Sequence, residues 1–361
     1  MRLSNFNKYC AIFTVLFLVG CDKIQNDKQC YEEILAWEEW LERGMSQAVA
    51  GDGPYYVPAD TVLFQSDIET NPSYGIISCF VISDSVLIIS DNNLGELHAF
   101  TLDGELLWTS GQPGEGPGCL TYMGGIDAYC NVIAVCNMSL NRVDLFNMDD
   151  GSYAKSLSIQ WPFDVSVAED STVVAVSITE EYLITMFDLQ GNVLASFGNW
   201  EPPSSDGMPY SPSAGNINLK CDILGDLLVV SSVYNNCYQV YDLENRSLVS
   251  SFSREPALPL ERSTSTRFIL QINDCVFNND GNIVALLCPA RCHWLDGRYS
   301  DLALEDITYK GLDIFLTTGE YLGGFALQTT WDSFTVQFIE NDVYVSNLEM
   351  LVKYCRVNLD E

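Results

Sequence analysis

One short pattern recurs along this chain and limits its possible folds more than any other feature. In Leu97–Gly118, two apolar strands alternate around Asp103-Gly104 and lead into a loop rich in glycine and proline. Alternation with a period of two suits a pleated strand, whose successive side chains point to opposite faces. Asp-Gly suits a tight hairpin turn because both residues tolerate a positive φ. We therefore predict a β-hairpin here.

The hairpin pattern returns along the chain, each time with an aromatic residue at the same place. The six aromatic residues are spaced 39 to 74 residues apart: Phe100, Phe146, Phe187, Tyr241, Phe315 and Tyr354. Such spacings suit a four-stranded unit with loops of variable length. A second strand, apolar on both faces, precedes each hairpin: Val86–Ser90, Val132–Cys136, Val173–Ser177, Leu227–Ser231, Ile283–Leu287 and Val343–Ser346. Strands of this kind suit a sheet packed between neighbouring sheets.

These repeats predict an all-β fold: a six-bladed β-propeller of four-stranded antiparallel blades over residues 61–361. Thr61–Gln65 is an isolated strand, and Leu351–Val357 can supply only the third strand of the last blade. We expect these two segments to pair. The ring is then closed by an N-terminal strand, which removes exposed sheet edges.

Residues 1–20 are typical of a signal peptide. Arg2 and Lys8 make a basic start, and the apolar run Ala11–Val19 is shorter than the roughly 20 residues that span a bilayer. The tetrapeptide ending at Cys21 resembles the lipobox of bacterial lipoproteins. That resemblance implies cleavage before Cys21 and attachment of lipid to its thiol. The alternatives are an uncleaved anchor or an ordinary signal followed by a chance cysteine.

Residues 21–60 are predicted to be a lipidated leader. Gln29–Arg43 suits a short helix with Gly44 as its stop, and Ala48–Asp60 is rich enough in glycine and proline to be a linker.

The chain is strongly acidic, with a formal net charge of −32. Such a surface repels phosphate backbones and anionic lipid headgroups, so we expect no nucleic-acid partner. The charge favours solubility, and it can also attract cationic or metal-bearing partners.

The chain has thirteen cysteines. Without Cys10 in the signal and Cys21 at the lipid, an odd number is left, so the rest cannot all pair internally. Cys130 and Cys136 flank a turn and could face each other. We nevertheless expect mostly free, buried thiols, because several cysteines lie in apolar strands.

Two further motifs have structural alternatives. Cys288-Pro-Ala-Arg-Cys292-His293 resembles the c-type haem attachment motif but has one residue too many between its cysteines. We expect instead a loop insertion in the fifth blade, Cys288–Gly311, that could serve as a binding loop; a metal or haem site is the alternative. Gly111–Gly118 lacks the Lys-Ser/Thr pair of a phosphate loop and is expected to connect two blades.

A hairpin that ends in Gly-x-x-Gly-Glu-Gly-Pro-Gly, in a chain with a lipobox, resembles the six-bladed β-propeller lipoproteins of Bacteroidota (the NHL/TolB-like propellers). The distinctive loop occurs once, at Gly111–Gly118, and the fifth blade fits the pattern least well. The resemblance implies a propeller fold and a place in the cell envelope. It implies no single activity.

Propellers bind ligands at the mouth of a central channel lined by the innermost strand of each blade. Polar residues at comparable places in the expected inner strands are candidates to line it: Ser78, Asp127, Asp164, Asn218, Gln271 and Thr335. The alternative is that these side chains form local hydrogen bonds or bind only water.

The favoured function is a non-catalytic scaffold, tethered to the membrane by its lipid, that binds a protein, peptide or glycan. No catalytic residue and no cofactor is predicted. The alternative is a metal-dependent propeller hydrolase or lyase with its site at the channel mouth. Two histidines exclude a three-histidine zinc site, but a calcium site of Asp and Asn oxygens stays open. A structural subunit of an envelope complex is a third possibility.

Overall fold

The computed structural model describes residues 55–63, 77–83, 86–178, 181–199, 219–232, 237–253, 266–295, 298–302, 309–328, 335–339, 342–346 and 350–357. The signal peptide, Cys21 and the predicted helix Gln29–Arg43 lie outside these residues. None of the helices in the described segments is long and apolar enough to cross a bilayer.

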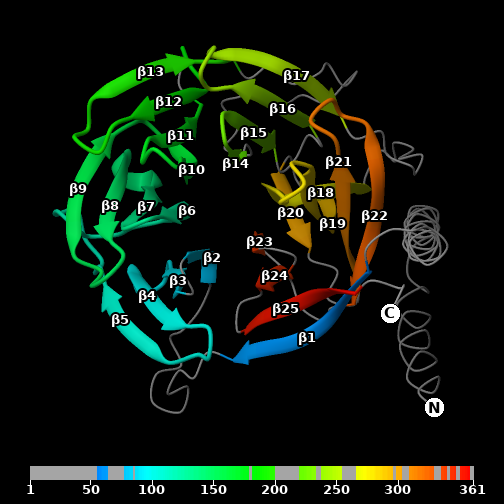
Figure 1. Cartoon of the computed structure of the whole chain (residues 1–361), viewed down its shortest axis with the longest axis horizontal. Coiled ribbons are helices and arrows are strands. Elements are labelled where there is room, and N and C mark those ends of the chain that lie inside the picture. The colour runs from blue at the N-terminus through cyan, green and yellow to red at the C-terminus, as the bar shows by residue number, and fades with distance from the viewer. Residues whose placement is uncertain are drawn as a thin grey trace.

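The described strands form six antiparallel sheets arranged around a common axis (Figure 1). Blade 1 contains β2 (Ile77–Ser83), β3 (Val86–Asp91), β4 (Glu96–Thr101) and β5 (Leu106–Ser110). Blade 2 contains β6 (Met123–Tyr129), β7 (Val132–Asn137), β8 (Arg142–Asn147) and β9 (Tyr153–Ser158), with the short 3-10 helix η1 (Met138–Leu140) after β7. Blade 3 contains β10 (Pro162–Val167), β11 (Val173–Ser177), β12 (Ile184–Phe187) and β13 (Val193–Phe197).

The second half of the ring continues in the same way. Blade 4 contains β14 (Leu219–Leu224), β15 (Leu227–Ser232), β16 (Cys237–Asp242) and β17 (Ser247–Ser253). Blade 5 contains β18 (Thr266–Phe277), β19 (Ile283–Leu295), β20 (Arg298–Leu302), β21 (Tyr309–Phe315) and β22 (Tyr321–Gln328). Blade 6 contains β23 (Thr335–Ile339), β24 (Asp342–Ser346), β25 (Met350–Val357) and β1 (Tyr55–Leu63). The predicted propeller of four-stranded antiparallel blades is therefore confirmed.

Each predicted aromatic residue lies on the third strand of its blade. The backbone register pairs it with the second strand as Phe100–Leu87, Phe146–Ile133, Phe187–Val173, Tyr241–Leu228, Phe315–Ile283 and Tyr354–Val343. In blades 1 to 5 the pairing with the outer strand shifts by a β-bulge next to this aromatic residue. A bulge increases local twist, so the recurring pattern encodes a bulged hairpin.

The turn of the first hairpin differs from the expected tight turn. Gly104 has a φ of 86°, but Asp103 has no positive φ. The Gly104 N–H donates to the carbonyl of Thr101, whose own N–H donates to the carbonyl of Glu105. The loop is thus a longer type of turn with glycine at its left-handed position, the usual companion of a bulge.

The hydrophobic core lies between the blades. Six clusters of buried apolar side chains occur among the described residues, each between two adjacent blades. In one of them Tyr344 of blade 6 packs with Phe80, Leu87 and Phe100 of blade 1. Full burial of such a side chain stabilises the fold by about 2–3 kcal/mol, which explains why the second strands are apolar on both faces.

Strand β1 pairs antiparallel with β25, in a register that sets Thr61 opposite Val352 and Val62 opposite Leu351. It begins at Tyr55, within the predicted linker Ala48–Asp60, so the boundary expected at residue 61 is corrected to an earlier position. The strand tolerates Pro58 because it is the outer strand of its sheet, and the register shifts just after that residue.

One expectation for blade 5 needs correction. The insertion at Cys288–Gly311 is present, but its first part is strand rather than loop: β19 continues to Leu295, and the additional strand β20 pairs with it. The Cys288–His293 motif thus lies on a strand, and its side chains are outside the described ones. Cys130 and Cys136 form no disulfide, because both are free. The described thiols of Cys119, Cys136, Cys221, Cys237 and Cys275 are free and buried, as expected for most of them.

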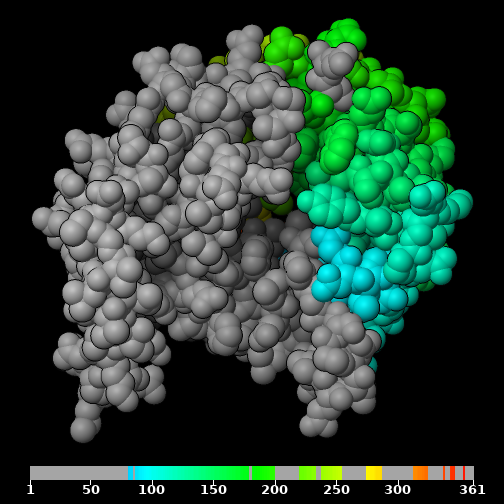
Figure 2. All heavy atoms as spheres, turned by 180° about the vertical axis from the view of Figure 1, so that it is seen from behind, coloured from blue at the N-terminus to red at the C-terminus, as the bar shows by residue number. Residues whose placement is uncertain are grey.

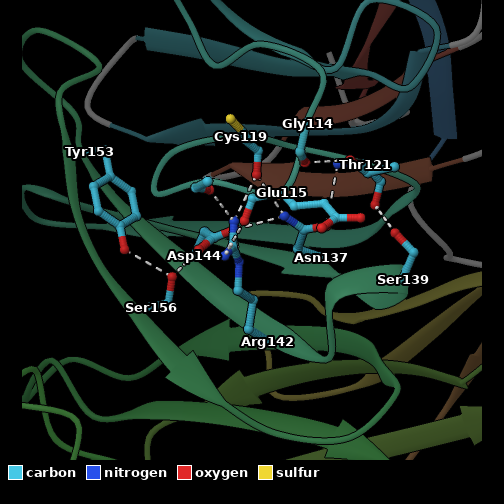
Figure 3. A network of polar contacts seen from close by, with 11 residues as sticks. Gly114, Glu115, Cys119, Thr121, Asn137, Ser139, Arg142, Asp144, Tyr153 and Ser156 are labelled. Carbon is cyan, nitrogen blue, oxygen red and sulfur yellow. Dashed lines mark hydrogen bonds and ion pairs between the residues drawn. The ribbon is translucent and has the colours of Figure 1, made fainter.

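The loop Gly111–Gly118 connects blades 1 and 2, as predicted, and Arg142 at the start of β8 holds it in place (Figure 3). The Arg142 guanidinium donates to the carbonyls of Gly116 and Cys119, at 2.8 and 2.9 Å. Its Nε donates to Asp144 Oδ2 at 2.9 Å, and Asn137 Nδ2 donates to the same oxygen at 2.7 Å. The Asp144 side chain is fully buried, so it depends on these donors.

Replacing Arg142 with methionine should destabilise the protein, because the buried Asp144 carboxylate loses its charged partner. We expect a loss of about 3 kcal/mol in the free energy of unfolding, measured by urea denaturation. The exposed Arg246 provides the matched control, Arg246→Met, for which the change should be near zero. Equal losses in the two variants would contradict a special role for Arg142.

Candidate functional site

The innermost strands enclose a cavity of about 230 Å³ in the central channel. Residues from all six of them line it: β2, β6, β10, β14, β18 and β23. The face shown in Figure 2 is hollowed near its centre, beside the cyan and green atoms of the early blades. This cavity is where a propeller is expected to bind a ligand.

Four aspartates line the cavity, and each holds the next blade. One carboxylate oxygen of each accepts a hydrogen bond from a backbone N–H of the following inner strand. The pairs are Asp127 with Val167 (2.7 Å), Asp164 with Cys221 (2.9 Å), Asp222 with Phe277 (2.6 Å) and Asp274 with Val336 (2.9 Å). We call these four bonds, together with the bond from Ile82 to Gln337 described next, the inter-blade bonds.

Gln337 makes the corresponding connection from blade 6 to blade 1. Its Oε1 accepts from the Ile82 N–H at 2.6 Å, and its Nε2 donates to the Ile82 carbonyl at 3.0 Å. An amide can do both because it carries an acceptor and a donor. Five of the six steps around the ring are therefore bridged by a described side chain.

The inter-blade bonds occur at two depths in the channel. In each blade the backbone register aligns one residue of the inner strand with the aromatic residue of the third strand. In blades 2, 4 and 6 the acceptor residue comes one position before this aligned residue, as Asp127 comes before Ala128. In blades 3 and 5 it is three positions before, as Asp164 is before Val167. At both depths the donor N–H belongs to the inner strand of the next blade, one aligned position further along than the acceptor residue. The same local geometry is thus repeated around the ring.

Burial changes the protonation of these carboxyl groups. Asp164 and Asp274 are buried, whereas Asp127 and Asp222 are partly open to the cavity. Desolvation raises the pKa of Asp127 to about 6 and that of Asp274 to about 7, and it also raises the pKa of Asp164 and Asp222. The backbone donors oppose this shift.

Lys220 is the cation among these acids, and it lies on β14 in the wall of the cavity. Its charge lowers the pKa of both Asp164 and Asp274, against the effect of burial. Two cavity carboxyls in different blades therefore share one cation.

The structure brings together only part of the predicted site. Asp127 and Asp164 line the cavity, and one oxygen of each carboxylate accepts a hydrogen bond from the next blade. Ser78 lies on β2, Gln271 on β18 and Thr335 on β23, but their side chains are outside the described ones. Asn218 lies outside the described residues altogether.

The sequence analysis missed Lys220, Asp222, Asp274 and Gln337. A signal for three of them was present in the spacing. Asp222 and Gln337, like Asp127, come six residues before the second-strand residue that faces the aromatic, and Asp274, like Asp164, comes nine residues before it. The inner strand expected for blade 5 was Ile269–Asn273, which stops one residue before Asp274, whereas β18 continues to Phe277.

His98 lies on the third strand of blade 1, away from the channel, as predicted. Its Nδ1 is 3.2 Å from Thr109 Oγ1, and burial lowers its pKa. Within the described segments, no group of three or more His, Cys, Asp or Glu side chains is placed to hold a metal ion.

No protein-family model matches the chain, and no curated protein matches it in sequence. Solved structures do resemble it. A member of the DUF4221 family from Bacteroides vulgatus aligns with a TM-score of 0.54 at 13% identity, covering 85% of this chain and 98% of that one. A Bacteroides fragilis protein described as exported aligns at 0.51 and 11% identity, covering 83% and 97%.

A virginiamycin B lyase from Staphylococcus aureus aligns less well, with a TM-score of 0.48 at 10% identity over 84% of this chain and 99% of that one. The TM-scores of 0.54 and 0.51 show a shared fold with the two Bacteroides proteins, and at identities this low none of the three structures carries information about activity.

Replacing Asp127 with asparagine should change how stability depends on pH. The Asp127 carboxyl group keeps its proton up to about pH 6 in the folded protein but only to about pH 4 in the unfolded chain. The stabilisation that this difference gives is therefore present below pH 4 and is lost as pH rises through 6. Asparagine keeps an acceptor for Val167 without titrating. Relative to wild type, the variant should therefore gain about 2 kcal/mol in free energy of unfolding between pH 4 and pH 7.

The measurement is urea denaturation of both proteins across this pH range. Asp149→Asn, at an exposed turn residue, is the control and should follow the wild-type curve. If the difference between wild type and Asp127→Asn is the same at all pH values, the Asp127 carboxyl group does not titrate as described.

Proposed function

We propose that this chain is a lipid-anchored β-propeller of the cell envelope that acts as a non-catalytic binding scaffold. The observation that carries the proposal is the use of the channel carboxylates. Asp127, Asp164, Asp222 and Asp274 each bind a backbone N–H of the next blade, so these acids hold the ring together. Their role in the fold leaves recognition to the faces of the propeller.

The thiols in and behind the channel wall also support a non-catalytic role. Cys221 lines the cavity, and Cys275 lies buried in the neighbouring inner strand. Desolvation and nearby carboxylates raise the pKa of both thiols well above the ordinary value. A nucleophilic cysteine needs the thiolate form, which this environment opposes. The hydrolase or lyase alternative stays a prediction.

The scaffold we propose is a six-bladed ring closed by β1. The pairing of β1 with β25 supports closure, as do the Gln337–Ile82 bonds and the packing of Tyr344 against blade 1. A ring bonded at five of its six steps keeps its loops in fixed relative positions. A pre-ordered surface loses little conformational entropy when it binds.

The envelope location rests on the lipobox at Cys21 and on the shared fold with an exported Bacteroides protein. A net charge of −32 would repel an anionic membrane surface. A covalent lipid offers this chain a membrane attachment that does not depend on charge.

The proposal is tested by incubating the purified full chain in detergent with a panel of envelope peptides and oligosaccharides. We expect calorimetry to show saturable binding of at least one ligand. Mass spectrometry should show that the recovered ligand is chemically unchanged, because the described channel acids serve the fold. Chemical conversion of a bound ligand would overturn the non-catalytic role. Failure to bind any member of the panel would count against the scaffold.

The anchor is tested separately with Cys21→Ser. This variant should lose metabolic labelling by palmitate and leave the membrane fraction, because the acylated thiol is absent. Cys130→Ser, at an exposed free cysteine of the propeller, is the control and should stay labelled and membrane-bound. A Cys21→Ser protein that still carries the label would show that the lipid is elsewhere.

A further inference from the structure

Two exposed aromatic residues occupy equivalent places in adjacent blades. Tyr122 immediately precedes β6 and is 62% exposed, and Trp161 immediately precedes β10 and is 54% exposed. Both therefore lie on the face of the propeller where the innermost strands begin. Large aromatic side chains are more commonly buried than left in water, so two at matching positions are informative.

Both residues also have an unfavourable backbone conformation. The φ of Tyr122 is 49° and that of Trp161 is 45°, in the left-handed region that bulky side chains avoid. Trp161 is doubly restricted because it precedes Pro162, and a residue before proline is normally extended. Strain of this kind persists only where the surrounding structure holds it, and it concentrates at functional sites.

The short helix η1 holds both residues in place from the middle of blade 2. The Met138 N–H donates to the Tyr122 carbonyl at 3.2 Å. At the other end of η1, Asn141 Oδ1 accepts from the Trp161 N–H at 3.1 Å. One rigid turn thus fixes the backbone of the two aromatic residues, while their side chains stay exposed.

The segments of chain around these residues contain no charged residue, although the exposed Glu115 lies in the loop whose Gly114 carbonyl accepts a hydrogen bond from Thr121 Oγ1. The segments 119–123, 137–141 and 158–162 contain no Asp, Glu, Lys or Arg, in a chain with 49 acidic residues. Their exposed polar side chains are hydroxyls and amides: Thr121, Ser139, Asn141, Ser158 and Gln160. We call Tyr122, Trp161 and these five residues the aromatic patch. Glu181, which interacts with Tyr182 in blade 3, is outside these segments.

We propose that the aromatic patch binds an uncharged glycan. The apolar C–H face of a sugar ring packs on an aromatic ring, and its hydroxyls pair with amide and hydroxyl groups at the edge. An anionic partner finds no free cation among the patch residues, and Arg142, which follows Asn141 in the sequence, is paired with Asp144 and the loop carbonyls. This inference rests on the proposed binding function and names its ligand class.

The inference is tested with the full chain on an array of immobilised neutral glucans, mannans, xylans and galactans, with polygalacturonate as an anionic comparison. The wild type should bind at least one neutral glycan, and added salt should leave this binding unchanged, because no ion pairs form.

Trp161→Gly separates a binding role from a structural one. Glycine adopts a positive φ without steric conflict, so the variant should unfold at the same or a higher temperature, by about 2 °C, and yet bind the glycan about tenfold more weakly. Tyr122→Gly should behave in the same way. Tyr129→Ala, at an exposed tyrosine at the opposite end of β6, should bind like wild type.

Wild-type affinity in both glycine variants would overturn the proposal, as would binding of polygalacturonate alone. If the array shows no glycan binding but the peptide panel does, the scaffold function holds and the glycan assignment fails. If neither is bound, both fail.

Discussion

The fold depends on an acceptor for the free edge of each innermost strand. An inner strand pairs with the rest of its blade on one side only, so its other edge presents N–H groups towards the channel. A buried N–H without a partner costs about 1–3 kcal/mol. Here the previous blade supplies the partner, through Asp127, Asp164, Asp222, Asp274 or Gln337. Each bond therefore satisfies an edge and joins two blades.

This solution has an electrostatic consequence. Carboxylates accept strong hydrogen bonds, but grouping them in one channel raises their pKa through desolvation and mutual repulsion. Lys220 offsets part of this for Asp164 and Asp274. The described channel acids thus join neighbouring blades, and their raised pKa values show the electrostatic cost of grouping them.

A ring whose blades are bonded within the channel can tolerate backbone strain on one of its faces. The left-handed conformations of Tyr122 and Trp161 are supported by η1, which continues directly from a strand buried between two blades. Their side chains are exposed and gain little from the core. We propose that they serve recognition, whereas the described channel acids join the blades.

The sequence by itself determined the architecture. The bulged hairpin, its aromatic residue and the apolar second strand are local patterns, and each could be read within about twenty residues. The site was only half predictable: Asp127 and Asp164 were identified, but Asp222, Asp274 and Gln337 were not, because the depth of a side chain in the channel depends on the length of each turn. Which N–H a carboxylate meets is decided by the next blade, forty or more residues away. Only the tertiary structure could show that the channel acids accept hydrogen bonds from the next blade, because that contact exists only when two blades are packed together.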